Sequence, residues 1–416
     1  MNNRLNADLY YVDGDIKKAK SLPLSVFWDS EFHKQALETI FTNSWICFPK
    51  QILRKAVDIS EREDLSKAET YLDILSIRGN EVLWNFLGED VMLKRDTDTR
   101  ESPLFCFSNR CPHAGYPMLK QRINRAGPKL GKLIECGQHH LTVKADGTFR
   151  FHPAFPNADD EIRKTLCLTR YDLEEGEDFY FICRGKPAVS LNNVLKPMLD
   201  IIDRMPFDRL EYGKNADEQR IVDGNWMLHA ANYMDMLHIK EGIHTGEGGL
   251  EGALLMDSYI TEFFANNPFM TLQWAYAKNP EDGFDPKFLP ERFNDPSHPE
   301  RRVFALWFFQ FPNITWNFYP WGLSLNIYMP IPEDPNHTEF FWFHYVLDRK
   351  KYSERNTRWL SQLVDTEDTD AISLVNRTLR GHARPWQRSI FGEEKERGPH
   401  WFHRMVYKMT FLPNFF

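Results

Sequence analysis

The 416-residue chain lacks an uninterrupted apolar run long enough to cross a bilayer, and its N-terminus lacks the apolar core of a secretory signal peptide. It also lacks an excess of positive charge, because 51 Lys and Arg face 59 Asp and Glu for a net charge of −8. These absences predict a cytoplasmic protein without a membrane span. They exclude the basic surface by which proteins bind nucleic acid.

Cysteine is also scarce, with six residues spread widely over the chain. So sparse a set in a long chain favours a reducing compartment over a disulfide-bonded one. Four of the six stand in apolar or strand-like segments and are interpreted as buried thiols, namely Cys47, Cys106, Cys167 and Cys183. The other two have a histidine nearby and call for a separate explanation.

Two short-spaced pairs combine these cysteines with histidines. Cys111 and His113 form a C-x-H pair, and Cys136 and His139 form a C-x-x-H pair after an interval of 22 residues. Two thiolates and two imidazoles can hold a Rieske [2Fe–2S] cluster, with the cysteines on one iron and the histidines on the other. Proline and glycine next to both pairs predict tight loops.

Structural zinc is the alternative for these four residues, because two cysteines and two histidines also form a zinc site. Zinc knuckles usually pair cysteine with cysteine and histidine with histidine. Here each loop supplies one of each, as a cluster needs when two adjacent loops both reach both irons. The sequence therefore favours a Rieske cluster, and His140, beside His139, is interpreted as structural.

The pattern of apolar residues changes from helical to strand-like near Trp45. Residues 22–43 carry apolar side chains at helical spacing, with Asp29 or Ser30 as the N-cap. Beyond Trp45, short apolar runs alternate with glycine, asparagine and charged residues, which is typical of strands. Asp146-Gly147 predicts a hairpin turn after the second ligand loop.

The C-terminal half mixes helices and strands. We expect a helix over 194–205, aromatic strands over 303–347 with a turn at 333–336, and a helix over 353–380 that Gly381 ends. The whole pattern predicts an α+β protein. Three parts are predicted. Residues 1–43 form an N-terminal helical segment that packs on the C-terminal domain. Residues 44–185 form a β domain, and residues 186–416 form a mixed domain.

A second group of metal-binding residue types lies within NYMDMLHIKEGIH at 232–244. Asp235 and His238 are three residues apart and would share one face of a helix. His244 follows six residues later, and Gly242 offers a break that would turn it back toward the same site. Two histidines and a carboxylate form the facial triad of non-haem Fe(II) enzymes, which leaves positions open for O2 and substrate.

The carboxylate ligand of such a triad must come from another segment. Asp370, in the predicted helix DTEDTDAISLVNRTLRG, is the favoured residue. Asp368 and Glu367 are the alternatives in the same segment. An electron-donating cluster needs an acceptor, and this second site would supply one.

The two motifs together resemble the catalytic α subunit of Rieske non-haem iron oxygenases of the ring-hydroxylating type, over most of the chain. The family's N-W…N-x-x-D-x-x-H-x(4–5)-H pattern is similar to Asn225-Trp226, Asn232, Asp235, His238 and His244. The interval between the cluster ligands is a few residues longer than usual in the family. The resemblance implies an all-β Rieske domain and a helix-grip-like catalytic domain with a curved antiparallel sheet and flanking helices.

The resemblance also implies ligands and roles. The cluster would be bound by Cys111, His113, Cys136 and His139, and mononuclear Fe(II) by His238, His244 and Asp370. Asp235 would join the two centres through hydrogen bonds to His238 and to a Rieske histidine of the neighbouring subunit in a head-to-tail homotrimer. Asn232 would lie beside the iron or line the substrate channel.

The implied activity is that of a terminal oxygenase that uses O2 and NAD(P)H electrons to hydroxylate, dihydroxylate or oxidatively demethylate a small aromatic or amine-type substrate. The chain has no dinucleotide or flavin fingerprint, so we expect a separate reductase, with or without a ferredoxin. The alternatives are a non-catalytic Rieske carrier, which the intact D-x-x-H…H pattern disfavours, and a hydrophobic-ligand binding protein. The aromatic strands suit the latter but are more typical of plain core.

Overall fold

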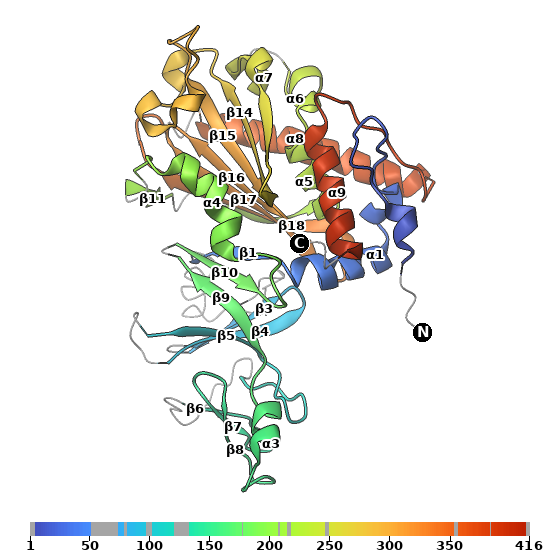
Figure 1. Ribbon diagram of the computed structural model, residues 1–416, viewed down its shortest axis with the longest axis vertical. Coiled ribbons are helices and arrows are strands. Elements are labelled where there is room, and N and C mark those ends of the chain that lie inside the picture. Colours follow the sequence, from blue (N-terminus) through green and yellow to red (C-terminus); the bar gives the residue numbers. More distant parts are fainter. Residues whose placement is uncertain are drawn as a thin grey trace. The chain divides into compact units, whose positions relative to one another are not determined.

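Figure 1 shows a computed structural model of the chain. It describes residues 5–50, 74–78, 81–96, 102–119, 133–176, 178–206, 209–213, 218–245, 249–352, 357–382 and 384–412. The chain divides into two compact units, one of residues 42–187 and one of residues 1–41 with 188–416. Much of the long interval between the predicted cluster ligands, at 120–132, lies outside the described residues.

The described residues of the smaller unit form two antiparallel sheets, which confirms the predicted β domain. One sheet has the strand order β1-β10-β9-β5-β4-β3-β2, and the other β6-β7-β8. A short helix, α3 (Asp160–Thr165), packs on β8. The strands are β1 Ile46–Pro49, β2 Ile74–Arg78, β3 Glu81–Phe86, β4 Glu89–Arg95, β5 Leu104–Ser108, β6 Leu133–Glu135, β7 Thr142–Lys144, β8 Phe149–Phe151, β9 Arg170–Glu175 and β10 Phe179–Cys183.

The β7–β8 hairpin turns at Asp146-Gly147, as predicted. Gly147 has a φ of +80°, and a Cβ there would lie 2.5 Å from a ring carbon of Phe107. The turn therefore requires glycine. Asp146 closes it by accepting the backbone N–H of Thr148 at 3.0 Å. Through Phe107 the hairpin joins a buried core that also contains Cys111, Cys136, Leu141, Val143 and Phe149.

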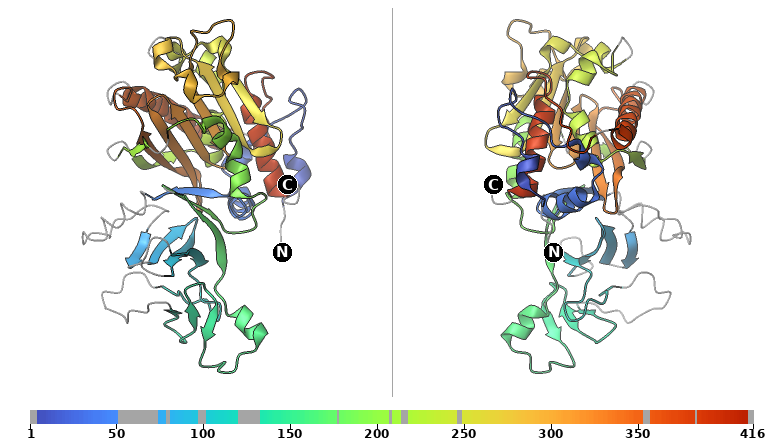
Figure 2. Two further views of the ribbon diagram at one scale, coloured as in Figure 1. Left: turned by 60° about the vertical axis from the view of Figure 1, so that its left-hand side comes forward. Right: turned by 90° about the vertical axis from the view of Figure 1, so that its right-hand side faces the viewer.

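The larger unit is built on an eight-stranded antiparallel sheet. The order is β11-β18-β17-β16-β15-β14-β13, and β12 pairs with β18. The strands are β11 Glu211–Tyr212, β12 Glu218–Asp223, β13 Ile260–Phe264, β14 Asn267–Tyr276, β15 Val303–Gln310, β16 Ile314–Tyr319, β17 Gly322–Ile331 and β18 Asp334–Val346. Figure 2 shows that this sheet is strongly twisted. A mixed α+β fold is thus confirmed.

Three helices gather beside this sheet. α5 lies between α8 and α9, packs on both, and also contacts β17, while α8 packs on β12 (Figure 1). The helices of the unit are α1 Ser30–Ala36, α4 Leu191–Ile202, α5 Trp226–Tyr233, α6 Leu237–Glu241, α7 Leu250–Ala253, α8 Thr357–His382 and α9 Arg397–Phe411. The segments that carry the second motif, α5, α6 and α8, are therefore neighbours.

The predicted N-cap placed the start of α1 correctly, whereas the helix expected over 194–205 begins three residues earlier, as α4. α1 begins after Asp29, whose side chain accepts the backbone N–H of Phe32 at 2.8 Å. The predicted C-terminal stop at Gly381 is wrong, because α8 continues to His382. Gly381 does not adopt the left-handed conformation of a helix-ending glycine, and a Cβ there would meet nothing within 4 Å.

The predicted turn at 333–336 is displaced. Ile331 pairs with Asp334, so β17 and β18 are joined by Pro332 and Glu333 alone. Asp334 and the residues after it already belong to β18. Because the connection has only two residues, the two strands form a long hairpin, and strand pairing continues into residues that the sequence assigned to the turn.

The N-terminal segment packs within the larger unit. Ser21 donates its backbone N–H to the carbonyl of Ser389 at 2.9 Å, and Leu22 donates to Nδ1 of His403 on α9 at 3.1 Å. Tyr10 stacks on Phe411 with ring centroids 5.0 Å apart. Among the described residues, no helix combines the length and the apolarity needed to cross a membrane.

His403 makes stability depend on pH. Burial lowers its pKa to about 3, helped by His400 and Arg388, whereas an unfolded histidine titrates near 6.5. Between these values the unfolded chain binds the extra proton, so acid favours unfolding by up to about 1.4 kcal/mol per pH unit. We expect the thermal midpoint to fall less between pH 7 and pH 5 in His403→Gln, which keeps an acceptor for Leu22. Equal falls in both proteins would refute this.

Candidate metal centres

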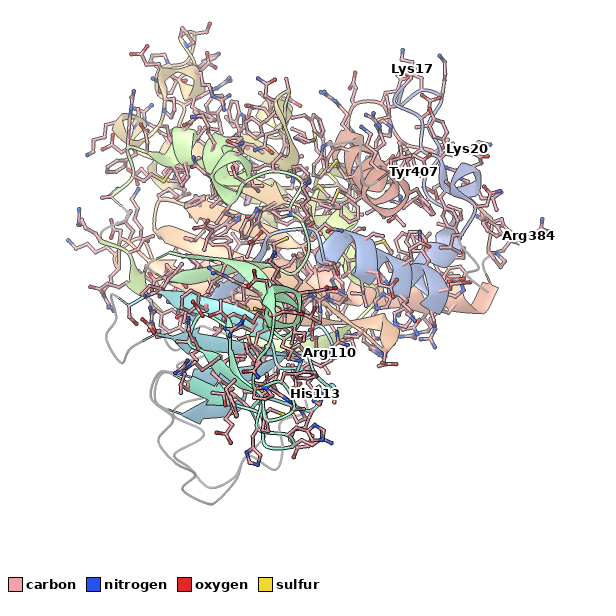
Figure 3. All side chains as sticks on the ribbon, turned by 60° about the horizontal axis from the view of Figure 1, so that its bottom comes forward. Lys17, Lys20, Arg110, His113, Arg384 and Tyr407 are labelled. Atoms are coloured by element: carbon pink, nitrogen blue, oxygen red, sulfur yellow. The ribbon has the colours of Figure 1, made fainter. Side chains whose placement is uncertain are left out.

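Two loops of the smaller unit bring the four predicted cluster ligands together. Cys111 follows β5 and Cys136 follows β6, and the two are only 3% and 1% exposed. His113 and His139 are exposed, and their Nδ1 atoms lie 3.2 Å apart. Figure 3 shows His113 beside Arg110, another exposed residue. Buried thiols below two outward imidazoles suit a cluster whose histidine-bound iron lies nearer the surface.

Backbone hydrogen bonds close both ligand loops. The N–H of Cys111 donates to the carbonyl of Tyr116 at 2.8 Å, and the N–H of Cys136 donates to Leu141 at 2.8 Å. His140 has a φ of +59°, a conformation uncommon outside glycine, and its Nδ1 lies 2.6 Å from a carboxylate oxygen of Glu135. This contact agrees with a structural role for His140.

A third histidine, which the sequence analysis did not single out, lies against the ligand set. His152 is 2% exposed, and its ring centroid lies 4.4 Å from that of His113. Its Nε2 is buried without a hydrogen-bond partner among the described residues. A buried polar atom without a partner is unfavourable, so this orphan marks a place where a further group belongs. The donor set and the orphan together fit a bound cluster.

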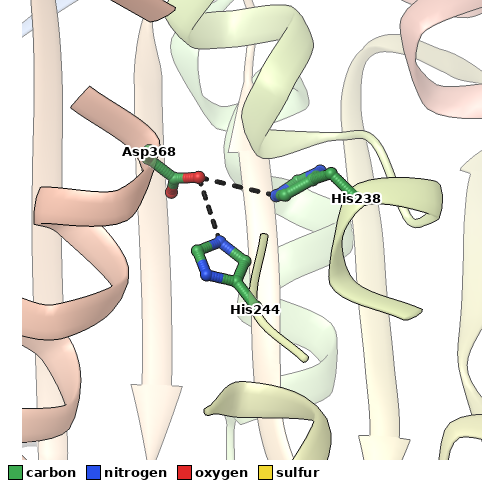
Figure 4. Close-up of side chains that lie close together, drawn as sticks. All are labelled: His238, His244 and Asp368. Atoms are coloured by element: carbon green, nitrogen blue, oxygen red, sulfur yellow. Dashed lines mark hydrogen bonds and ion pairs between the residues drawn. The ribbon is translucent and has the colours of Figure 1, made fainter. Parts of the chain in front are cut away.

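The second centre lies in the larger unit. His238 on α6, His244 after it and Asp368 on α8 converge there (Figure 4). Oδ1 of Asp368 lies 3.0 Å from Nε2 of His244 and 3.6 Å from Nε2 of His238. One ligand atom from each residue lies within 4.8 Å of the others. Two imidazole nitrogens and one carboxylate oxygen match the facial triad that binds non-haem Fe(II).

The carboxylate choice is corrected by this geometry. Asp370 is exposed and is not part of the group, whereas Asp368 faces the histidines. Residues two apart on an α-helix point about 200° away from each other, so only one of the two can face the site. Apolar periodicity could not decide between them, because both stand among polar residues.

The histidines reach the site through two breaks in this helical segment, of which the one at Gly242 was predicted and the one after α5 was not. The helix stops after α5 and restarts as α6, and Asp235 between them accepts the backbone N–H of Leu237 at 2.8 Å. Gly242 then turns the chain back, as predicted. A Cβ at Gly242 would lie 2.7 Å from the Cα of His238, so only glycine permits this close return toward His244.

Carboxylates hold both ring nitrogens of His244. Its side chain is 1% exposed, with Nδ1 2.7 Å from Oε2 of Glu367 and Nε2 3.0 Å from Oδ1 of Asp368. Burial opposes protonation of His244, but the hydrogen bonds and charges of the two carboxylates outweigh it and raise the pKa. A metal on Nε2 would leave Nδ1–H to Glu367, the usual way a protein orients a metal-binding histidine.

Asn232 and Asp235 also contact the group. Asn232 donates its side-chain N–H to Oδ1 of Asp368 at 2.8 Å. Oδ2 of Asp235 lies 3.4 Å from Nδ1 of His238, the ring nitrogen opposite the one that faces Asp368. Asn232 thus orients the carboxylate, whereas Asp235 places a negative charge beside the imidazole of His238, whose Nδ1 has no hydrogen bond among the described residues.

A cavity of about 570 Å³ opens beside the triad. His238, His244 and Asp368 line it at one side, together with Asn232. Aromatic side chains supply much of the wall, namely Tyr233, Tyr259, Phe304, Trp307, Tyr319, Trp321, Tyr328, Phe340 and Trp342. Such a volume with apolar walls and few polar groups is typical of small-molecule sites.

Uncharged polar side chains cross the cavity wall in one row. Gln273, Trp307, Asn317 and Ser324 are paired in register across β14 to β17. The hydroxyl of Tyr233 donates a hydrogen bond to the side-chain carbonyl of Asn317 at 2.6 Å. Part of the hydrogen-bonding capacity of this row is therefore used within the protein. The sheet side of the cavity is therefore neutral and able to form hydrogen bonds, whereas charged side chains lie elsewhere in the lining, namely Glu281, Asp282, Lys350, Lys351 and Asp365.

One more histidine faces the cavity. His229 on α5 is buried, its Nε2 lies 3.0 Å from the carbonyl of Asp223, and burial lowers its pKa to about 4. It also stacks on Tyr328. His229 is therefore neutral at neutral pH and adds no charge to the wall.

Paired substitutions on α8 test the corrected carboxylate. We expect Asp368→Ala to lose the mononuclear iron while it retains the two irons and two sulfides of the cluster. Asp370→Ala, an exposed position two residues along the same helix, should keep both metals. Iron and acid-labile sulfide per chain, measured after anaerobic purification, check this. Loss of mononuclear iron in Asp370→Ala alone would reverse the assignment.

Comparisons with protein families match both parts of the chain. Residues 207–410 match the ring hydroxylating alpha subunit (catalytic domain), and residues 72–169 match the Rieske [2Fe–2S] domain. The second match contains Cys111, His113, Cys136 and His139, which decides against the zinc alternative. The first contains His238, His244 and Asp368.

Solved structures share the fold. A quaternary ammonium Rieske monooxygenase, CntA, is 18% identical with a TM-score of 0.62, over 98% of this chain and 99% of that one. Naphthalene 1,2-dioxygenase from Rhodococcus sp. is 15% identical with a TM-score of 0.57, over 94% and 93%. Among curated proteins, no sequence matches the chain. With both of its regions matched, the chain belongs to the Rieske oxygenase α subunits and is an enzyme of this mono- and dioxygenase class.

Proposed function

We propose that the chain is a terminal oxygenase that hydroxylates, dihydroxylates or oxidatively demethylates a small aromatic or amine-type molecule with O2. A separate NAD(P)H-dependent reductase, with or without a ferredoxin, supplies its electrons. The observation that carries the proposal is the position of His238, His244 and Asp368, which converge at the edge of an aromatic cavity of about 570 Å³.

The metal-binding residues form two groups. The cluster is held by Cys111, His113, Cys136 and His139, and mononuclear Fe(II) by His238, His244 and Asp368. When bound, these groups supply one-electron transfer and O2 activation, chemistry that no protein side chain provides. The chain itself has to fix the ligands, position the substrate and limit access of water.

Three residues fix the ligands of the mononuclear site. Glu367 keeps the proton of His244 on Nδ1, so that Nε2 is free for the metal. Oδ2 of Asp235 lies 3.4 Å from Nδ1 of His238, an ion-pair contact without a hydrogen bond, and its charge favours the tautomer that carries the proton on Nδ1. Asn232 holds Asp368 in place through a 2.8 Å hydrogen bond. Each contact keeps a ligand atom pointed at one place and leaves the cavity side open.

Asp235 also has a role between copies of the chain. In a head-to-tail homotrimer it would accept a hydrogen bond from a Rieske histidine of a neighbouring copy while it holds His238. His113 and His139 are both exposed, as such a contact requires. A structure of CntA is described as giving insight into inter-subunit electron transfer, which supports the same arrangement here.

The cavity wall supports the proposed substrate class. CntA binds L-carnitine and γ-butyrobetaine as substrates, and naphthalene dioxygenase binds indole. Aromatic faces attract both quaternary ammonium groups and flat arenes. The row Gln273, Asn317 and Ser324 would orient a neutral polar group of such a molecule. An electron carrier or a ligand-binding protein would have no need of a triad beside this cavity.

Metal analysis tests the proposal first. Anaerobically purified protein should contain three irons and two acid-labile sulfides per chain, with a Rieske-type EPR signal after reduction by dithionite. Two irons and two sulfides that Fe(II) cannot supplement would instead favour a Rieske carrier. Zinc without sulfide would refute the assignment of the smaller unit.

Substitution of Asp235 tests its role between the two centres. Asp235→Asn should keep both metals, because Asp235 is not itself a ligand, yet turnover coupled to reductase should fall by at least about a hundredfold, since the amide disturbs the imidazole that it orients. Asp257→Asn, at an exposed carboxylate on the same unit, is the matched control. Iron content and single-turnover product check the prediction, and turnover near that of the parent would contradict it.

A further inference from the structure

His152 lies close to the cluster ligands yet is not one of them. It follows β8, and its ring lies at 60° to that of His113 with the centroids 4.4 Å apart. Phe155 covers it from a centroid distance of 5.2 Å. At 2% exposure the imidazole is shielded from solvent.

One hydrogen bond determines which ring nitrogen of His152 carries the proton. The backbone N–H of Ala154 donates to Nδ1 of His152 at 3.1 Å, so Nδ1 is the acceptor. A neutral imidazole has one acceptor and one donor nitrogen, which places the proton on Nε2.

This Nε2–H has no acceptor among the described residues, although its nitrogen is buried. A buried donor without an acceptor is costly, and native proteins rarely leave one. Cluster sulfurs are hydrogen-bond acceptors, and they would lie among the ligand atoms that surround His113. The unpartnered Nε2–H therefore lies where a sulfur of a cluster held by His113 would accept its hydrogen bond.

We propose that His152 donates its Nε2–H to a sulfur of the Rieske cluster and thereby raises the reduction potential. One electron from the reductase converts a diferric cluster to a ferric–ferrous one and adds one negative charge. A hydrogen bond to sulfur stabilises this added charge, which favours reduction. The inference rests on the bound cluster and is independent of the substrate proposed above.

Three variants of the full-length holoprotein test the proposal. His152→Leu removes the donor, His152→Gln keeps an N–H at similar reach, and Phe155→Leu alters only the packing beside the ring. The midpoint potential of each is measured by redox titration at one pH, with the EPR spectrum as a check that the cluster is intact. We expect the equilibrium constant for cluster reduction to be about tenfold lower in His152→Leu than in the parent. The potentials of His152→Gln and Phe155→Leu should stay close to that of the parent.

An unchanged potential in His152→Leu with an intact cluster would overturn the proposal and place the acceptor elsewhere in the protein. If His152→Leu does not assemble a cluster, His152→Met takes its place, and equal potentials for Met and Gln would overturn the proposal. The parent itself offers an independent test by pulsed EPR with ¹⁵N-histidine. The parent should show a weakly coupled nitrogen beyond the coordinating and remote nitrogens of the two ligand histidines, and His152→Gln should lack it. Identical nitrogen couplings in the two proteins would refute the hydrogen bond.

Discussion

The carboxylate of Asp368 lies between two imidazoles, and the larger unit depends on this convergence for its chemistry. The three residues come from a short helix, the turn after it and a long helix more than a hundred positions later. Side chains from three separate segments need further contacts to stay in one orientation. Asn232 and Glu367 supply hydrogen bonds to Asp368 and His244, and Asp235 lies 3.4 Å from Nδ1 of His238.

In the smaller unit, the four cluster ligands differ in how deeply they are buried. Cys111 and Cys136 belong to the hydrophobic core, whereas His113 and His139 stand on exposed loop tips. A buried pair and an exposed pair give the cluster an inner and an outer side. Only the outer side can contact another protein, and electron transfer requires a short distance between the two redox centres. His152 adds a neutral donor at the boundary between core and loops.

Predictions from local patterns succeeded where the physics is local. The cap at Asp29, the turn at Asp146-Gly147 and the break at Gly242 each depend on contacts within a few residues, and all three were correct. The errors arose where residue type alone was too weak a signal. Gly381 has the residue type of a helix end, yet it does not adopt the left-handed conformation and α8 continues to His382. Asp370 and Asp368 differ only in which side of α8 faces the histidines, and partners elsewhere in the chain decide that.

The sequence by itself determined the cofactor class, because the spacing of cysteine and histidine in the two loops restricts the chemistry to few metals. It also determined that the two iron histidines stand in one segment with Asp235. Only the tertiary structure decided that Asp368, and not Asp370, lies beside His238 and His244, which residues of β14 to β17 face the cavity, and that His152 lies against His113. The reason is that spacing along the chain constrains ligands on one loop or helix, whereas contacts between segments depend on strand register and helix rotation.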